Sequence, residues 1–173
     1  MAFLHLTSNL GNVVFLYNKA RYSLFSFYYY MTMASEKTKI TIQTHVNAPV
    51  QKVWTLWSTP DDIKNWCAAS PDWHTTKADN DLRAGGTFSS RMEAKDGSFG
   101  FDFSGVYDVV TQNEYLEYTL DDTRKVTINF KAEGKNTHII QTFEAENENP
   151  IEMQRGGWQA ILDNFKTYAE SQS

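Results

Sequence analysis

The chain has 173 residues, with 16 lysine and arginine side chains against 21 aspartate and glutamate side chains, and this length predicts one domain of ordinary size. An acidic chain without a basic cluster is repelled by phosphate backbones and anionic lipids, which argues against nucleic-acid and membrane-surface binding. The single cysteine, Cys67, excludes an internal disulfide and any multi-cysteine metal site. We expect a cytoplasmic protein in which Cys67 is a half-buried apolar thiol rather than a reactive one.

Residues 1–35 differ from the rest because they are rich in aromatic side chains and contain neither proline nor acid. Polar residues, among them Asn18, Lys19 and Arg21, interrupt the apolar run, so the segment matches neither a secretory signal nor a membrane span. Two basic residues are also few for a transit peptide. We favour a translation start at Met31 or Met33 over targeting, and we expect the folded domain to occupy residues 36–173.

The domain opens with a strand and two short helices. From Lys39 to Val46 apolar and polar side chains alternate, as in a half-buried strand. Pro49 then suits the first turn of a helix, and Thr59-Pro60 predicts a second helix with Thr59 as its capping residue.

After Pro71 the sequence predicts a series of strands joined by turns. The turn Asp96-Gly97 is typical of a type I′ hairpin, in which both central residues have positive φ. Consecutive strands joined in this way form an antiparallel meander. The expected strands are Trp73–Ala78, Thr87–Glu93, Phe99–Val110, Tyr115–Leu120, Lys125–Lys131 and Thr137–Phe143.

A long helix is predicted to end the chain, with Asn149 as its cap, Pro150 in its first turn and Glu152 completing a capping box. Gly156 and Gly157 lie inside this helix, although each glycine costs roughly 1 kcal/mol relative to alanine there. Two explanations remain open. The glycines allow close approach of the sheet or keep space for a ligand, or they mark a slack or kinked first turn.

This order of elements is that of the α+β helix-grip fold, also called START-like or Bet v 1-like, in which a curved antiparallel sheet wraps around a C-terminal helix. The sequence resembles the START-like (SRPBCC) superfamily, and its branch is similar to homologues of the C-terminal domain of the activator of heat-shock protein 90 ATPase. The resemblance covers Thr38 to about Glu170, and it is carried by Ala48-Pro49-Val50-Gln51-Lys52-Val53-Trp54, Gly85-Gly86-Thr87-Phe88, Gly105-Val106-Tyr107, Tyr115-Leu116-Glu117-Tyr118-Thr119, Thr137–Phe143 and Gly157-Trp158.

The resemblance implies a cavity between the sheet and the C-terminal helix, but no shared reaction, because this fold hosts binding proteins, cyclases and co-chaperone domains alike. Residues 1–35 are too short for the chaperone-binding domain that precedes this domain in the co-chaperone. A filled core is the alternative to a cavity, since protein interiors are close-packed. Our candidates for the cavity lining are Trp73, Phe88, Met92, Phe101, Phe103, Tyr118, Phe130, Gly157, Trp158 and Phe165.

No metal site or catalytic constellation is evident from residue spacing. No pair among His5, His45, His74 and His138 has the spacing of a metal motif along the chain, so we expect surface histidines and no metal ion or cofactor. Four aromatic residues, Phe99, Phe101, Phe103 and Tyr107, fall on one face of a long strand. Arg83 is a candidate for the cavity mouth, where it would meet a ligand carboxylate.

We therefore predict a cofactor-free domain that binds a small apolar or aromatic molecule, with neither nucleic acid nor a membrane as partner. The first alternative is a polyketide cyclase-like or aromatase-like enzyme, in which His74, Asp102 or Tyr118 shuttles a proton. The second alternative is a chaperone-interaction module in the stress response, motivated by the family branch alone. A homodimer is a further expectation that the sequence leaves open.

Overall fold

The computed structural model describes residues 37–172, and the predictions made for residues 1–35 lie outside this range. The first strand, β1 (Lys39–Val46), follows the predicted alternation, because Ile40, Ile42 and Val46 are buried and Thr44 is half-buried, while the alternate side chains are exposed. Burying one face in this way is what holds a strand in its register.

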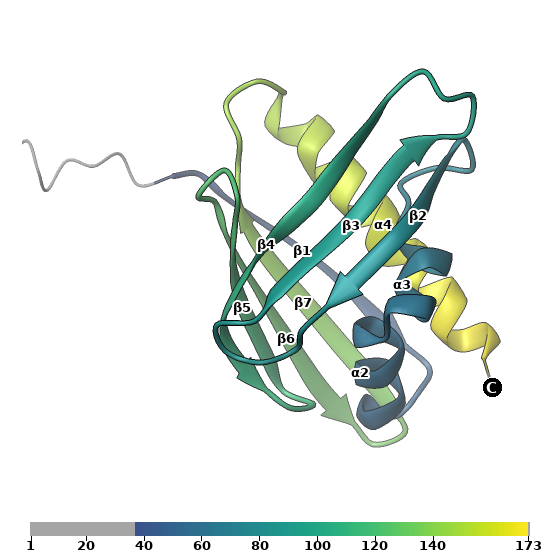
Figure 1. The fold of residues 1–173 in the computed structure, drawn as a ribbon. Helices are drawn as coiled ribbons and strands as arrows, with labels where there is room; N and C mark the ends of the chain where they lie inside the picture. Colours follow the sequence, from purple (N-terminus) through teal and green to yellow (C-terminus); the bar gives the residue numbers. More distant parts are fainter. Residues whose placement is uncertain (1–36, 173) are drawn as a thin grey trace, which may run out of the picture. The chain divides into compact units, whose positions relative to one another are not determined.

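Seven strands form one antiparallel sheet in the order β1-β7-β6-β5-β4-β3-β2. Strands β1 and β2 are neighbours in sequence but occupy opposite edges, so the two short helices between them cross from one edge of the sheet to the other (Figure 1). The remaining bounds are β2 Trp73–Asn80, β3 Thr87–Ala94, β4 Gly100–Thr111, β5 Tyr115–Leu120, β6 Lys125–Glu133 and β7 Asn136–Glu144.

The helices begin close to where the prolines predict, but their caps differ from the prediction. Helix α2 spans Val50–Ser58 and helix α3 spans Pro60–Trp66. The Thr59 hydroxyl does not cap α3 and instead donates to the Thr55 carbonyl oxygen at 2.8 Å. Helix α4 (Ile151–Ser171) likewise has no side-chain cap; its N-cap position is Pro150, one residue after Asn149, whose amide nitrogen donates to Glu146 at 2.8 Å. Thr59 thus occupies the predicted N-cap position without a side-chain capping bond, whereas the prediction of Asn149 as the cap of α4 was wrong.

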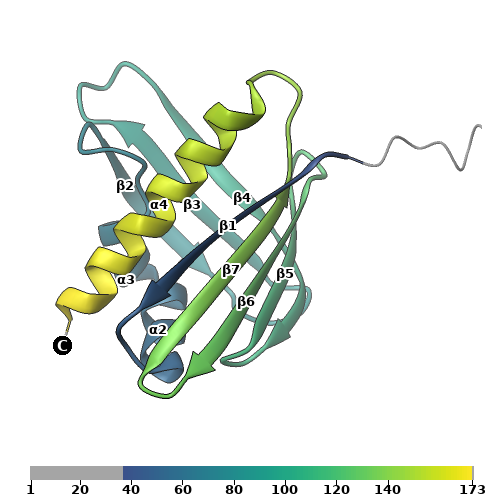
Figure 2. The same cartoon turned by 180° about the vertical axis from the view of Figure 1, so that it is seen from behind.

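Helix α4 lies along the concave face of the sheet (Figures 1 and 2). Its Arg155 and Gln159 side chains donate to the Thr41 and Gln43 carbonyl oxygens of β1, at 2.9 and 3.3 Å. These bonds satisfy backbone acceptors along an edge strand that would otherwise be open to pairing with another chain. The architecture is the predicted α+β helix-grip fold.

The β3–β4 hairpin closes in a different way from the expected type I′ turn. Only Gly97 has a positive φ, of 75°, and its N–H donates to the Ala94 carbonyl oxygen at 2.9 Å. Asp96 keeps negative φ and its carboxylate accepts from the Ser98 N–H, so it stabilises the turn through its side chain. The prediction of the hairpin is confirmed, and that of its turn type is wrong.

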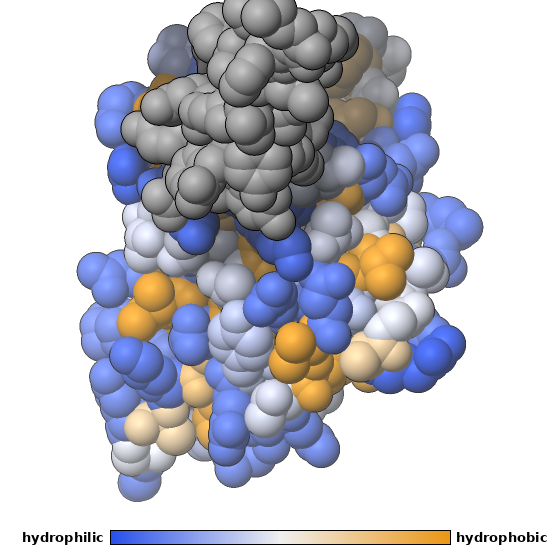
Figure 3. Space-filling view, turned by 90° about the vertical axis from the view of Figure 1, so that its left-hand side faces the viewer, coloured by the Kyte–Doolittle hydropathy of each residue, from blue (hydrophilic) through white to orange (hydrophobic). Residues whose placement is uncertain are grey.

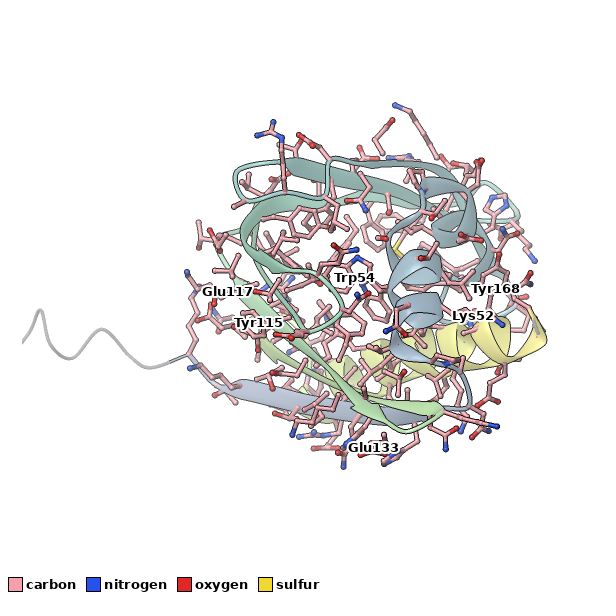
Figure 4. All side chains as sticks on the ribbon, turned by 90° about the horizontal axis from the view of Figure 1, so that it is seen from below. Lys52, Trp54, Tyr115, Glu117, Glu133 and Tyr168 are labelled. Atoms are coloured by element: carbon pink, nitrogen blue, oxygen red, sulfur yellow. The ribbon has the colours of Figure 1, made fainter. Side chains whose placement is uncertain are left out.

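An aromatic cluster joins the three helices to the sheet. Trp57 packs edge-on against Phe130 and Phe165, with ring centroids 5.5 and 4.7 Å apart, and Trp66 packs against Phe165 at 5.1 Å. Trp54 points from α2 into the interior, and Tyr168 of α4 lies beside the short helices (Figure 4), where its hydroxyl donates to Asp62 at 2.6 Å. This cluster closes the end of the fold at which the short helices lie.

Within residues 37–172, no helix has both the length and the apolar composition needed to cross a bilayer.

Candidate functional site

A pocket of about 510 Å³ lies between the sheet and α4. Its wall takes residues from α2 and α3, from strands β2, β3, β4, β5 and β7, and from the first half of α4. Eight of the ten predicted lining residues are in this wall: Trp73, Phe88, Met92, Phe101, Phe103, Tyr118, Gly157 and Trp158.

The structure places the other two predicted lining residues, Phe130 and Phe165, outside the wall. Trp57 packs against both rings, and Phe130 and Phe165 are 3% and 0% exposed. Trp57 and Trp66 themselves line the pocket, so the tryptophans of the short helices stand between these phenylalanines and the cavity. The alternation of each element predicts which side chains point inward, but it does not reveal which inward side chain is covered by another.

The aromatic residues of β4 divide between the pocket and the surface. Phe101, Phe103 and Tyr107 line the pocket, as expected for alternate residues of one strand. Phe99 lies before the first residue of β4 and is 63% exposed. Phe103 packs edge-on against Trp158 of α4 at 5.7 Å, and Trp158 stacks on Phe143 at 4.0 Å with an interplanar angle of 11°. These contacts fix the aromatic wall from both sides.

The two helical glycines border open space. A Cβ added to Gly156 or to Gly157 would meet nothing within 4 Å, and α4 continues without a break through both positions. Close approach of the sheet therefore does not explain the glycines. Gly157 lies in the pocket wall, whereas Gly156 is exposed and lies outside it.

A hydrogen-bonded chain crosses the wall on the β2 side. The Tyr107 hydroxyl donates to Asn80 Oδ1 at 2.9 Å, and Asn80 Nδ2 donates to the Ser58 carbonyl oxygen at 2.6 Å. Burial raises the pKa of both Tyr107 and Tyr118 above the ordinary range, so both phenols stay protonated at neutral pH. They can donate hydrogen bonds but are poor general bases.

The cation in the wall is Arg124, which sequence reasoning missed. It follows the β5–β6 turn, its side chain is only 16% exposed, and its Nε donates to Asp122 at 2.8 Å while a terminal nitrogen donates to the Glu144 carbonyl oxygen at 3.4 Å. A guanidinium carries five N–H donors, so Arg124 can hold these two acceptors and a ligand oxygen at once. Arg83 lies outside the wall, paired with Asp81 at 2.8 Å with 69% of its side chain exposed.

The loop from β7 to α4 completes the polar end of the pocket. Backbone hydrogen bonding from Glu148 and side-chain hydrogen bonding from Asn149 lower the pKa of Glu146, and the nearby charge of Arg124 adds to this effect. Gln154 is 7% exposed and bridges the loop to α4, because its amide nitrogen donates to the Glu146 and Asn149 carbonyl oxygens. The loop is held by these bonds at the point where it borders the cavity.

The thiol of Cys67 also belongs to the wall. Burial raises its pKa from 9.0 to about 11, while a hydrogen bond involving Thr75 acts in the opposite direction. A thiolate is the nucleophilic form of cysteine, so this thiol is poorly suited to covalent catalysis. The thiol is buried rather than half-buried as expected, and its raised pKa agrees with the expectation that it is unreactive.

Of the three residues proposed for proton transfer, the structure brings only Tyr118 to the pocket. Asp102 is 58% exposed and lies 3.6 Å from Arg91. His74 lies on β2 opposite Glu93. The other two histidines of the described range, His45 and His138, stack on each other although they are far apart in sequence.

The sequence comparison identifies one family. The profile described as "Activator of Hsp90 ATPase homolog 1-like protein" matches residues 47–170. No curated protein matches this sequence.

Solved structures extend this match. An AHSA1-like protein from Aeromonas hydrophila, solved by NMR, is 44% identical, covers 78% of this chain and 94% of its own, and superposes with a TM-score of 0.74. A protein from Cytophaga hutchinsonii is 52% identical over 78% of this chain and 93% of its own, with a TM-score of 0.68. A protein from Nitrosomonas europaea, 19% identical over 81% of this chain and 98% of its own, shares the fold with a TM-score of 0.68.

Proposed function

The chain belongs to the activator of Hsp90 ATPase homolog 1-like family, a branch of the START-like superfamily, and on that premise we propose that its pocket binds a small apolar or aromatic molecule without a cofactor. The observation that carries the proposal is the pocket itself. Its volume of about 510 Å³ falls within the roughly 300–1,000 Å³ of ligand sites. Protein interiors are otherwise close-packed, so a space of this size between sheet and helix favours an occupant.

The wall favours a flat apolar molecule with one polar end. Trp73, Phe103 and Trp158 offer aromatic surfaces, while Arg124 supplies hydrogen-bond donors at the end bordered by the β7–α4 loop. Burying a polar group is costly unless it is hydrogen-bonded, so the ligand's polar end should be an acceptor that reaches Arg124. Because Asp122 and Glu146 offset the charge of Arg124, a carbonyl or phenolic oxygen would suit this end as well as a carboxylate.

Two arginine variants test this orientation. Arg124→Gln should weaken binding of 2-naphthoic acid by about tenfold, which is the loss of one charge-assisted hydrogen bond of about 1.5 kcal/mol, and should leave the binding of naphthalene nearly unchanged. Arg83→Gln removes an equal charge outside the wall and should change neither affinity. Isothermal titration calorimetry measures both. Equal loss for both ligands, or an equal effect of both variants, would count against the assigned orientation.

Ligand binding is favoured over cyclase-like or aromatase-like catalysis by the state of Tyr118. Of the three candidates for proton transfer it is the one that lines the pocket, and its burial keeps the phenol protonated. A buried phenol can orient a ligand by donating a hydrogen bond, but general-base catalysis requires a pKa near the operating pH.

A chaperone contact is the second candidate function, and it is suggested by the description of the matched family as homologues of an Hsp90 ATPase activator. Phe99 and Met153 are each 63% exposed, which is the kind of surface that a protein partner covers. On the face shown in Figure 3, however, hydrophobic side chains form small patches separated by hydrophilic ones. A pull-down with purified heat-shock protein 90 that shows neither binding nor a change in ATPase rate would remove this candidate.

A further inference from the structure

We propose that His45, Glu133 and His138, here called the histidine cluster, form a binding site for a divalent late transition metal such as Zn²⁺. The register of the sheet builds the cluster. His45 of β1 and His138 of β7 are direct partners, and Glu133 ends β6 two residue pairs from His138 along the β6–β7 ladder, which keeps it on the same face of the sheet. Direct partners in an antiparallel pair share a face of the sheet. The two imidazole rings accordingly stack with centroids 4.1 Å apart and an interplanar angle of 11°.

The three ligand atoms nearly converge already. Glu133 lies beside the stacked rings, with one carboxylate oxygen 3.1 Å from His45 Nδ1 and the other 3.6 Å from His138 Nδ1. One ligand atom from each of the three residues lies within 4.8 Å of the other two. Ligands at about 2.0–2.1 Å from a tetrahedral zinc ion are about 3.3 Å apart, so a shift of roughly 1 Å would complete the site. The side chains of His45 and Glu133 are 60% and 46% exposed, which leaves them room to move.

A hydrogen bond to Gln43 prepares His138 for a metal. His138 Nε2 lies 3.0 Å from Gln43 Oε1, and because an amide oxygen only accepts, Nε2 must carry the hydrogen. In the neutral ring Nδ1 then presents its lone pair to a carboxylate oxygen of Glu133, two acceptors facing each other at 3.6 Å. A cation between them removes this repulsion. Metal-bound histidines usually donate their second ring nitrogen in this way, so Gln43 acts as a positioning residue.

The chemistry of the cluster selects the class of metal. Two imidazoles and one carboxylate suit zinc, nickel or copper, whereas calcium and magnesium prefer oxygen ligands alone. Lys131 is the direct partner of His138 on β6, and its positive charge on the same face opposes any bound cation. Glu133 lies on the outer side of the sheet, away from the space between sheet and α4 (Figure 4). A bound ion would tie β1, β6 and β7 together independently of the pocket ligand.

The test is zinc titration of the full chain, freed of metal with a chelator and held near neutral pH, by calorimetry and by thermal unfolding. The wild type should bind one Zn²⁺ at this site and unfold at a higher temperature when zinc is present, because a ligand that binds only the folded state stabilises it. His138→Ala should lower the affinity at least about tenfold. Glu133→Gln keeps the size of an exposed side chain and should do the same, which guards against misfolding of the histidine variant.

Three more variants separate a metal site from incidental binding. Gln43→Leu should weaken zinc about 10- to 100-fold, as loss of a metal ligand's outer partner usually does. Lys131→Gln should tighten zinc, and His74→Ala, which removes a histidine outside the cluster, should leave it unchanged. The proposal is overturned if zinc fails to raise the unfolding temperature of the wild type. It is equally overturned if His138→Ala and Glu133→Gln both bind zinc as the wild type does, because the zinc would then be bound elsewhere on the chain.

Discussion

Filling the pocket from Gly157 should expel the ligand without harming the fold. A side chain at this position starts in open space, because an added Cβ meets nothing within 4 Å, and it extends from the pocket wall. Gly157→Leu therefore places an apolar side chain in the space proposed for the ligand. The matched control is Gly156→Leu, since Gly156 has equally open surroundings but lies outside the wall.

The structure sets the size of both effects. Each variant should raise the free energy of unfolding by about 0.8 kcal/mol, because leucine is that much better than glycine in a helix interior. Gly157→Leu should add up to about 1.5–3 kcal/mol by burying its side chain against the pocket wall. A ligand must displace that side chain to enter, so its affinity should fall by about the same free energy, which is roughly 10- to 100-fold.

Urea unfolding and titration with the fluorescent probe 1-anilinonaphthalene-8-sulfonate measure the two quantities on the same samples. The expected pattern is two stabilised variants, of which only Gly157→Leu loses probe binding. A folded Gly157→Leu protein that binds the probe as tightly as Gly156→Leu would refute the placement of the ligand beside α4.

Three further predictions concern the core and the pocket wall. Burial raises the pKa of the Cys67 thiol from 9.0 to about 11, so the folded state holds this proton more tightly than the unfolded state. The resulting contribution to stability is complete below about pH 9 and is lost as the pH rises towards 11. In urea unfolding, the free energy of unfolding should therefore fall less between about pH 8 and pH 10 for Cys67→Ala than for the wild type. Gly105→Ala should lower the free energy of unfolding by about 1–3 kcal/mol, because the added Cβ would lie 2.4 Å from the Thr119 carbonyl oxygen. A cost near zero in the same assay would contradict this, because it would show that the strands can separate to admit a methyl group. Phe165→Ala should lower the free energy of unfolding by about 3–5 kcal/mol, because the ring is fully buried. Phe101 is 39% exposed, so Phe101→Ala should cost little stability and should mainly weaken binding of the probe. Equal stability costs for the two variants would contradict the assignment of Phe165 to the core and Phe101 to the pocket wall.

The local signals in the sequence predicted the fold well because they are physically local. Alternation along Lys39–Val46 and the prolines at the starts of the two short helices depend only on near neighbours, and the structure agrees with both. The capping bonds were predicted less well, because a capping side chain can choose among several partners. Asn149 hydrogen-bonds to Glu146 and not to the start of α4, and nothing in the local sequence pattern shows which of these two partners it takes.

The site was predicted in part, and the omissions have a common cause. Arg124 follows a turn, and whether a turn cation folds back over the pocket or points to solvent depends on side chains distant in the sequence. His45 and His138 meet because of strand register, which joins positions 93 residues apart that no spacing rule along the chain would connect. Phe130 and Phe165 were placed on the correct inward faces, but tryptophans of the short helices cover them.

The central claim is that the pocket holds a small molecule, and native mass spectrometry of the protein isolated from its own source tests it most directly. The native mass is compared with the denatured mass of the same sample. An excess native mass that disappears on denaturation, and that is absent from a Gly157→Leu protein made in the same cells, is the predicted result. The claim would be contradicted if the wild type had equal native and denatured masses and also bound naphthalene-based probes no more tightly than the Gly157→Leu protein does.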